Sequence, residues 1–433
     1  MMLDLRHFYK ACNPSKTLNT AKPGDRKMYI DFSNVRGSNV IRELERTITV
    51  LSGNEPTCQL FTGHIGCGKS TELLRLKYQL EKQDYHVVYF ESSQDLDMAD
   101  VDITDILLAI TRQVSESLEK VDIFLKPTYF KKLFQEIVEW LQTPIEVDVE
   151  AELSLGIGKV TAKTKESPQL RKQLRQYLEP RTSNILDSIN KEFFQPAKEN
   201  LRKNGQKGLV VIVDNLDRID STLKPSGRRQ PEYLFVDRGE QLKGLNCHLV
   251  YTIPLVLAFS NDLGQITNRF GVEPKVLPMV PVKWRDESLY EEGLATLRRM
   301  VLARAFPKHS EAEQLELVTE IFKQSEDLDY ICQMSGGHVR TLLSLLFRCM
   351  QQGDPPFSRQ CLENVVRRRR GELTRAIEDE EWTVLRRVVN QKSTKGEEDY
   401  HLLLRSLFVY EYQDIEGSWF DINPILLGAM PND

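Results

Sequence analysis

The sequence predicts an α/β protein with a parallel sheet, a helical lid after it and a winged-helix segment at the C-terminal end. Apolar runs of strand length at 58–62, 86–90 and 209–213, with a helical pattern between the first two, predict the sheet. Strand, loop, helix and strand in this order is the unit from which parallel sheets are built. Helical periodicity over much of 286–351 predicts the region that follows.

Length and composition are those of a globular protein with more than one domain. The chain has 433 residues, and its net charge of -5 gives no overall attraction to nucleic acid. The apolar runs are too short to span a bilayer, and the first residues lack the features of a secretory signal. The seven cysteines form no CxxC pair or metal-spaced cluster. We therefore expect a cytoplasmic protein with no membrane contact.

The N-terminal half divides into a leader and a core. Residues 1–36 form the leader, punctuated by prolines, and 37–285 form the core with an insertion at 102–205. Within the insertion, apolar residues at 142–166 alternate first with acidic residues and then with lysines. This period of two predicts a β-hairpin between helices. Its apolar face packs on the helices of the insertion or contacts a partner.

The segment after the first strand predicts a phosphate-binding loop. Residues 63–71 read GHIGCGKST and fit G-x-x-x-x-G-K-[ST] at every fixed position. Glycines let successive N–H groups face phosphate oxygens, the lysine reaches the β- and γ-phosphates, and the serine hydroxyl serves a magnesium ion. A small residue fits the position of the cysteine, and a redox role is the weaker interpretation. The loop residues are Gly63, His64, Ile65, Gly66, Cys67, Gly68, Lys69, Ser70 and Thr71.

The strand at 209–213 ends in a carboxylate, Asp214, as a Walker B strand does. With Ser70, this carboxylate is the expected magnesium ligand, so the two motifs together predict binding of ATP and magnesium. The next residue is Asn215, which cannot take a proton. Proteins that hydrolyse nucleotide with these two motifs commonly have a glutamate at this position. Asp217 is our preferred catalytic base, with Glu91 as the alternative, although a structural role for Asp217 is nearly as well supported. We expect slow or partner-dependent hydrolysis.

Four segments together resemble the AAA+ and STAND branches of P-loop ATPases, above all the initiator-like clade: GHIGCGKST, VVIVDNLDRID, HLVYTIP and SGGHVRTLL. The spacing of Asp214 and Asp217 is similar to the NACHT and KAP variants of Walker B. The resemblance implies that Thr252 contacts the γ-phosphate or the attacking water and that Arg340 reaches the nucleotide from the lid. It also implies that Arg269 enters the site of a neighbouring subunit. In the KAP branch an insertion of this kind carries membrane helices, which 102–205 lacks.

The C-terminal part divides into a helical lid, 286–378, and a winged-helix segment, 379–433. Two helical patterns followed by short strands on either side of a turn at 414–418 predict the latter. Winged helices often bind DNA, and the four arginines at 367–370 could neutralise phosphates. In STAND proteins the same module packs on the ATPase core, and an arginine run is commonly the solvated end of a helix.

The sequence therefore predicts an ATP-binding, slowly hydrolysing switch whose nucleotide state controls self-assembly into a homo-oligomer or engagement of a protein partner. The first alternative is a DNA-associated AAA+ ATPase resembling initiators or transposition regulators. The second is a scaffold that binds nucleotide without cleaving it. A P-loop kinase is disfavoured, because a lid and a winged helix have no place in a small single-domain enzyme.

Overall fold

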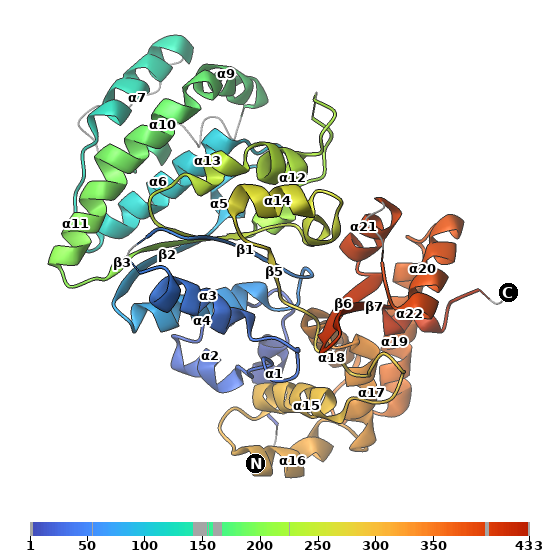
Figure 1. Ribbon diagram of the computed structural model, residues 1–433. Helices are drawn as coiled ribbons and strands as arrows, with labels where there is room; N and C mark the ends of the chain where they lie inside the picture. The colour runs from blue at the N-terminus through green and yellow to red at the C-terminus, as the bar shows by residue number, and fades with distance from the viewer. Residues whose placement is uncertain are drawn as a thin grey trace.

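A five-stranded parallel sheet forms the centre of the protein (Figure 1). The computed structural model describes residues 3–53, 55–141, 154, 156–158, 167–224, 226–394 and 398–431. The strands lie in the order β2-β3-β4-β1-β5. They are β1 (Cys58–Thr62), β2 (Tyr85–Glu91), β3 (Gly208–Asp214), β4 (His248–Thr252) and β5 (Lys275–Val276). The predicted α/β class and the three strands that defined it are confirmed, whereas β5 is too short to leave a pattern.

Successive residues of each strand point to opposite faces of the sheet, and both faces are buried. In β3, Leu209 and Val211 belong to one hydrophobic cluster, while Val210 and Ile212 belong to another. Burial on both faces explains why these strands read as continuous apolar runs. Helices α3 (Val40–Arg46) and α4 (Lys69–Glu81) cover one face; α6 (Ile103–Glu119) and α11 (Gln195–Lys203) lie over the other (Figure 1).

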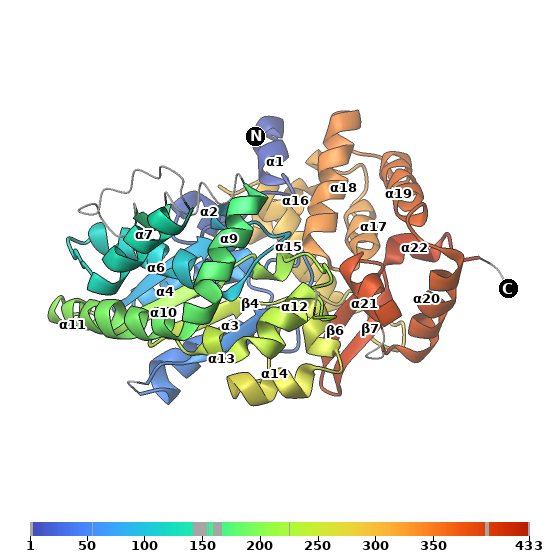
Figure 2. The same cartoon turned by 90° about the horizontal axis from the view of Figure 1, so that it is seen from above.

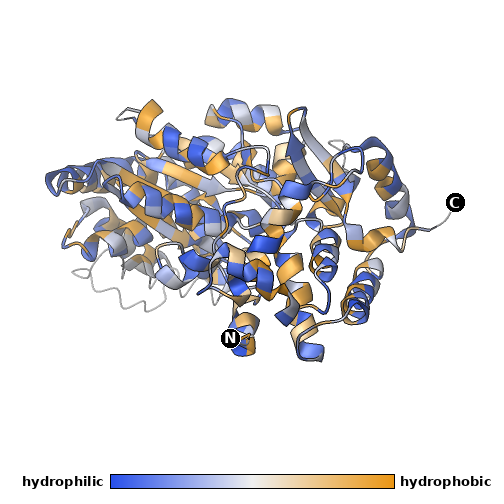
Figure 3. Cartoon of the chain, turned by 90° about the horizontal axis from the view of Figure 1, so that it is seen from below, coloured by the Kyte–Doolittle hydropathy of each residue, from blue (hydrophilic) through white to orange (hydrophobic). Residues whose placement is uncertain are grey.

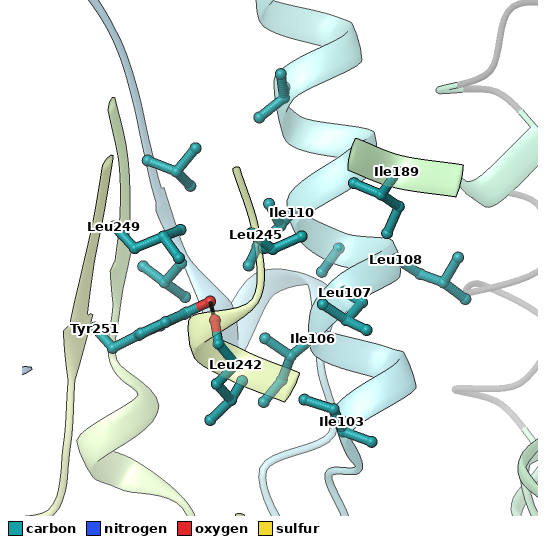
Figure 4. Packing of buried hydrophobic residues seen from close by; sticks show 14 of the residues in the cluster. Ile103, Ile106, Leu107, Leu108, Ile110, Ile189, Leu242, Leu245, Leu249 and Tyr251 are labelled. Carbon is teal, nitrogen blue, oxygen red and sulfur yellow. Dashed lines mark hydrogen bonds between the residues drawn. The ribbon is translucent and has the colours of Figure 1, made fainter. Parts of the chain in front are cut away.

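The insertion between β2 and β3 is helical where the structure describes it. Its helices are α5 (Ser92–Asp95), α6, α7 (Thr128–Leu141), α9 (Pro168–Leu178), α10 (Thr182–Ser188) and α11. Figure 4 shows α6 turning Ile106 and Ile110 toward Leu249 and Tyr251 of β4. The hairpin expected over 142–166 falls almost entirely outside the described residues. The few that are described there, 154 and 156–158, are helical rather than extended.

Short helices precede and follow β4 in the chain, and two more lie in the leader. They are α12 (Gln230–Glu232), α13 (Gly239–Lys243) and α14 (Leu263–Phe270), and the leader contributes α1 (Leu5–Ala11) and α2 (Pro23–Met28). The hydroxyl of Tyr251 donates to the carbonyl of Leu242 at 3.1 Å, which ties β4 to α13 (Figure 4). A buried tyrosine of this kind satisfies its polar end while its ring packs in the core.

A helical region follows the sheet and leads to a two-stranded hairpin (Figures 1 and 2). The elements are α15 (Glu291–Ala305), α16 (Glu311–Glu316), α17 (Glu326–Ser335), α18 (Val339–Gln352), α19 (Arg359–Thr374), α20 (Asp379–Gln391), α21 (Glu398–Arg405), β6 (Val409–Asp414), β7 (Gly417–Ile422) and α22 (Pro424–Leu427). Strands β6 and β7 are antiparallel, with Val409 opposite Ile422. The expected succession of two helices and a hairpin is present; that this segment is a winged helix stays a prediction.

The leader, the helical region and the C-terminal segment share one hydrophobic cluster. Phe8 of α1, Leu297 of α15 and Phe420 of β7 are buried members of it. Tyr9 also stacks on Phe347 of α18, with ring centroids 4.2 Å apart. Helices throughout the protein carry hydrophobic residues on one side and hydrophilic residues on the other (Figure 3). The domain limits at 36, 285 and 378 stay predictions, and one hydrophobic cluster continues across all three of them.

Candidate functional site

The loop between β1 and α4 bends at glycines. Gly63, Gly66 and Gly68 have φ values of 152°, 95° and 109°, which residues other than glycine rarely adopt. A Cβ added to Gly66 would lie 2.7 Å from the Nε2 atom of His338 and 2.8 Å from the Cβ atom of Arg340. Gly66 is therefore required both for the bend and for the close approach of another segment.

Lys69, the first residue of α4, lies at the centre of the site. Its Nζ atom donates to the carbonyls of Gly63 and His64 at 2.7 and 2.8 Å, and lies 3.0 Å from Oδ2 of Asp217. Both side chains of the ion pair are nearly buried, with 6% and 5% of their surface exposed. Burial acts to lower the pKa of Lys69, but Asp217 outweighs it and raises the pKa above its ordinary value. The amine is therefore a fixed positive charge at the phosphate loop.

Asp214 ends β3 beside the start of α4. Its oxygens accept from the hydroxyl of Tyr89 and from the N–H of Asn215, each at 2.7 Å, and the hydroxyl of Ser70 also bonds to it. Asn215 has a φ of 66°, a conformation that asparagine tolerates better than most residues. Burial first, and then the neighbouring carboxylate of Asp217, raise the pKa of Asp214.

The residues around Asp214 fit a divalent cation. Two buried carboxylates, Asp214 and Asp217, face a single ammonium, and Oδ1 of Asp217 is buried without a hydrogen-bond partner among the described residues. A divalent cation prefers oxygen ligands of this kind and would neutralise part of the charge on these two carboxylates. Ser70 and Asp214, the two expected ligands, lie together as the sequence required. Their role as magnesium ligands stays a prediction.

Three successive residues of the loop bond to segments from the C-terminal half. Nε2 of His64 accepts from the N–H of Glu411 in β6 at 2.9 Å. The carbonyl of Ile65 accepts from Nε2 of His338 at 3.0 Å, and the carbonyl of Gly66 accepts from the N–H of Arg340 at 3.2 Å. Burial lowers the pKa of both histidines, that of His338 to about 3, so both rings are neutral. The loop is thereby bonded to the start of α18 and to the C-terminal hairpin.

The two arginines implied by the family resemblance lie in different parts of the structure. Arg340 lines the same cavity as Lys69 and Asp214, as expected for an arginine of the lid. Burial first, and then Arg218, lower its pKa. Arg269 lies at the end of α14 and is absent from the lining of that cavity. A role in a neighbouring subunit therefore stays a prediction.

Thr252 lies behind the site rather than in it. Its hydroxyl accepts from the N–H of Leu216 at 3.0 Å and donates to the carbonyl of Val213 at 3.3 Å. The side chain is fully buried and does not line the cavity, so the expected contact with phosphate or water is not what this structure shows. Thr252 instead fixes the turn that follows Asp214. Of the two candidate bases, only Asp217 lines the cavity; Glu91 does not.

The leader supplies a wall of the site that sequence reasoning missed. Residues 14–18 line the cavity, and the N–H of Leu18 donates to Oγ1 of Thr71 at 3.3 Å. The buried Arg36 donates to the carbonyl of Cys67 at 2.7 Å. Cys67 is a buried free thiol packed close to Gly63, which suits the structural interpretation of that position.

The arginine run at 367–370 is partly used inside the protein. Arg370 donates to the carbonyl of Ile425 at 2.7 Å, and Arg369 pairs with Glu372 at 2.9 Å. Arg367 and Arg368 are exposed. Arg370 therefore joins α19 to α22, and Arg369 is paired within α19.

Comparison with known proteins finds a family model that matches part of the chain. Residues 38–223 match the KAP family P-loop domain, and no curated protein matches the sequence. This segment is thus similar to the KAP family P-loop domain, in line with the resemblance that the spacing of Asp214 and Asp217 carries. The helices that the structure describes include none with the length and apolar character to cross a membrane.

Several solved structures resemble the whole chain loosely. A Walker-type ATPase of Pyrococcus abyssi is 11% identical, with 97% of this chain and 99% of that chain covered and a TM-score of 0.46. The ORC2 protein of Aeropyrum pernix is 14% identical, with 99% and 96% covered and a TM-score of 0.39. Drosophila ORC bound to DNA is 13% identical, with 97% and 90% covered and a TM-score of 0.39. At these scores the likenesses carry no conclusion about this protein.

Proposed function

We propose that the KAP family domain binds ATP with magnesium and acts as a slow switch that controls the position of the lid and the C-terminal hairpin. The observation that carries this proposal is the set of bonds from His64, Ile65 and Gly66 to Glu411, His338 and Arg340. A change in the backbone of the phosphate loop must alter all three bonds. Nucleotide binding is therefore coupled to the C-terminal half by direct contact.

The loop and Lys69 would hold the phosphates, and Ser70 with Asp214 would hold magnesium. Bound magnesium supplies positive charge beside the phosphates. Lys69 keeps its ammonium in a buried setting, where electrostatic interactions are strong. Arg340 adds a second fixed positive charge from the lid, since its guanidinium stays protonated. These residues favour a negatively charged phosphate group and its transition state.

Hydrolysis would be slow because the position after Asp214 cannot accept a proton. Asn215 lines the cavity but has only an amide side chain. Asp217 is the nearest carboxylate, and it is already paired with Lys69 at 3.0 Å. To act as base while it keeps that pairing through Oδ2, Asp217 must accept a hydrogen bond from water at its other oxygen. Its unpartnered Oδ1 atom offers the place for that bond.

Self-assembly in the ATP state is the second part of the proposal, with Arg269 reaching a neighbour. Arg269→Ala should leave turnover unchanged in dilute protein and lower it only at concentrations where an oligomer forms. Mass photometry with and without ATP, run alongside the ATPase assay, measures both quantities. A lower rate in the dilute monomer would refute the role of Arg269 across an interface.

The alternative, a DNA-associated ATPase, draws its support from Arg367 and Arg368, which remain exposed. The other two arginines of the run are bonded within the protein, so less positive charge is left for DNA phosphates than the sequence suggested. DNA-stimulated turnover with salt-sensitive binding would favour this alternative over the switch. ATP binding without turnover in either condition would favour a scaffold.

Hydrogen–deuterium exchange tests the switch directly, because the amides of Arg340 and Glu411 donate to the loop. Exchange in peptides covering 338–342 and 409–413 should differ between protein with ATP and protein without nucleotide. Lys69→Ala should weaken ATP binding by roughly 10- to 100-fold and remove that difference, since a charged hydrogen bond to phosphate is lost. Lys82→Ala, at the exposed end of the same helix, is the matched control. Identical exchange with and without saturating ATP would refute the coupling.

A further inference from the structure

A second hollow lies at the opposite edge of the sheet. The amino-terminal ends of β2, β3 and β4 border it at Tyr85, Gly208 and His248, and its volume is about 440 Å³. Strand β3 therefore begins at this hollow and ends at Asp214 in the nucleotide site. Seven residues of extended chain span roughly 20 Å. The two sites are thus separate, but one strand joins them.

The hollow is positively charged. Lys198 and Arg202 of α11 and Lys207 of the following loop line it, and none of its 14 described lining residues carries a carboxylate. Lys198 and Arg202 are four residues apart, so they share one face of the helix, where like charges repel. In the described part of the chain neither has an ion-pair partner. Lys207 lies 3.9 Å from Asp84, and both side chains are more than half exposed, so this pair is weak.

Lys198 is held among groups that do not neutralise it. Burial and the neighbouring Arg202 lower the pKa of Lys198, while the Cys247 thiol acts in the opposite direction. Burial and Lys198 together lower the pKa of His248 to about 4, so that ring is neutral. Its Nδ1 atom shares a hydrogen bond of 3.1 Å with the hydroxyl of Thr57. Two repelling cations beside a neutral ring are an arrangement that an anion would stabilise.

We infer that this hollow binds a small phosphorylated ligand. A lysine ammonium and an arginine fork on one helix face suit phosphate oxygens, which accept from both. Part of the remaining wall is apolar or aromatic, at Pro56, Leu209 and the ring of Tyr85, and can take the carbon part of such a ligand. The volume falls in the range of small-molecule sites, and the hollow is concave where a duplex backbone would need an open surface.

Isothermal titration calorimetry with pyrophosphate at fixed ionic strength tests this site without help from the phosphate loop. The titration is run on Lys69→Ala protein and, independently, on the wild-type chain saturated with ADP. We expect one pyrophosphate to bind in both. The double variant Lys198→Gln/Arg202→Gln should weaken that binding at least tenfold. Lys203→Gln, an exposed lysine of the same helix outside the hollow, should leave it unchanged.

Three outcomes would overturn the inference. One is the absence of pyrophosphate binding at millimolar concentration in both backgrounds. Another is equal affinity in the double variant and in the Lys203→Gln control. The third is a single-stranded oligonucleotide that binds through Lys198 and Arg202 far more tightly than pyrophosphate, which would replace the small ligand by a nucleic-acid backbone.

Discussion

The two ends of β3 differ in how the cationic side chains beside them are paired. At the carboxyl end, Lys69 is buried and fully engaged by Asp217 and two carbonyl groups. At the amino end, Lys198 and Arg202 face a hollow whose described lining has no carboxylate. The first arrangement places two carboxylates and the hydroxyl of Ser70 together, a set of oxygen atoms that suits a divalent cation. The second has an excess of positive charge, which suits an anion. One strand therefore connects two sites of opposite electrostatic demand.

The largest effect should come from breaking the pairing at the carboxyl end. Asp217→Asn removes the carboxylate that both pairs with Lys69 and is our candidate base. We expect turnover to fall by about 100-fold, the usual contribution of a general base. ATP affinity should be unchanged or higher, since Lys69 loses its competing partner. Single-turnover hydrolysis and equilibrium binding of ATP measure the two quantities.

Asp220→Asn, three residues further on and exposed, is the matched control for that measurement. It should leave both turnover and affinity unchanged. If Asp217→Asn turns over like the control, Asp217 has a structural role only. Glu91 would not then become the base by default, because it does not line the cavity.

A second, smaller effect should come from a carboxyl group that forms no ion pair among the described residues. Glu411 is fully buried behind the phosphate loop, and burial raises its pKa to about 8, against an ordinary value of 4.5. Between these values the folded protein binds one proton more than the unfolded chain, so stability falls as pH rises through this range. Each unit of pKa corresponds to about 1.4 kcal/mol, so the total is a few kcal/mol at most.

Glu411→Gln removes this titration while its side-chain oxygen can still accept from Ser418. The melting temperature of the wild-type protein should therefore fall relative to that of the variant as pH rises from 6 to 9. Differential scanning fluorimetry at several pH values measures the difference. A constant gap between the two proteins across this range would show that Glu411 keeps an ordinary pKa.

The sequence predicted the carboxyl end of the sheet well, because that chemistry is local. The loop from Gly63 to Thr71 needs glycines and a lysine at fixed spacing, and Asp214 follows the most apolar strand in the chain. The strands β1, β2 and β3 were found for the same reason, since burial on both faces leaves an unbroken apolar run. Arg340 lines the cavity as expected, because the motif around it is also short, and its contact with nucleotide stays a prediction.

The remaining parts of the site depend on contacts between distant segments, which no local pattern reports. The wall made by Leu18 bonds to a residue 53 positions away, and Glu411 bonds to His64 across 347 positions. Thr252 was expected in the cavity from its place at the end of β4. Whether its hydroxyl faces a ligand or the neighbouring backbone depends on the turn at Leu216. That turn takes its shape from a positive φ at Asn215, which the sequence alone did not reveal.

The smallest effect should appear at the amino end, and with the opposite sign. Lys198→Gln removes a half-buried charge that Arg202 repels, and glutamine is about as good a helix former as lysine. The free energy of unfolding should therefore rise by about 0.3 kcal/mol at low salt, and the gain should shrink as salt screens the repulsion. Lys203→Gln should give no gain, because a lysine in the last turn of a helix is favoured by the helix dipole. If a urea titration gives equal changes in the free energy of unfolding for the two variants, Arg202 does not repel Lys198 as proposed. Added pyrophosphate should reverse the order, so that wild-type protein becomes the more stable, because the same two cations that repel each other would then share an anion.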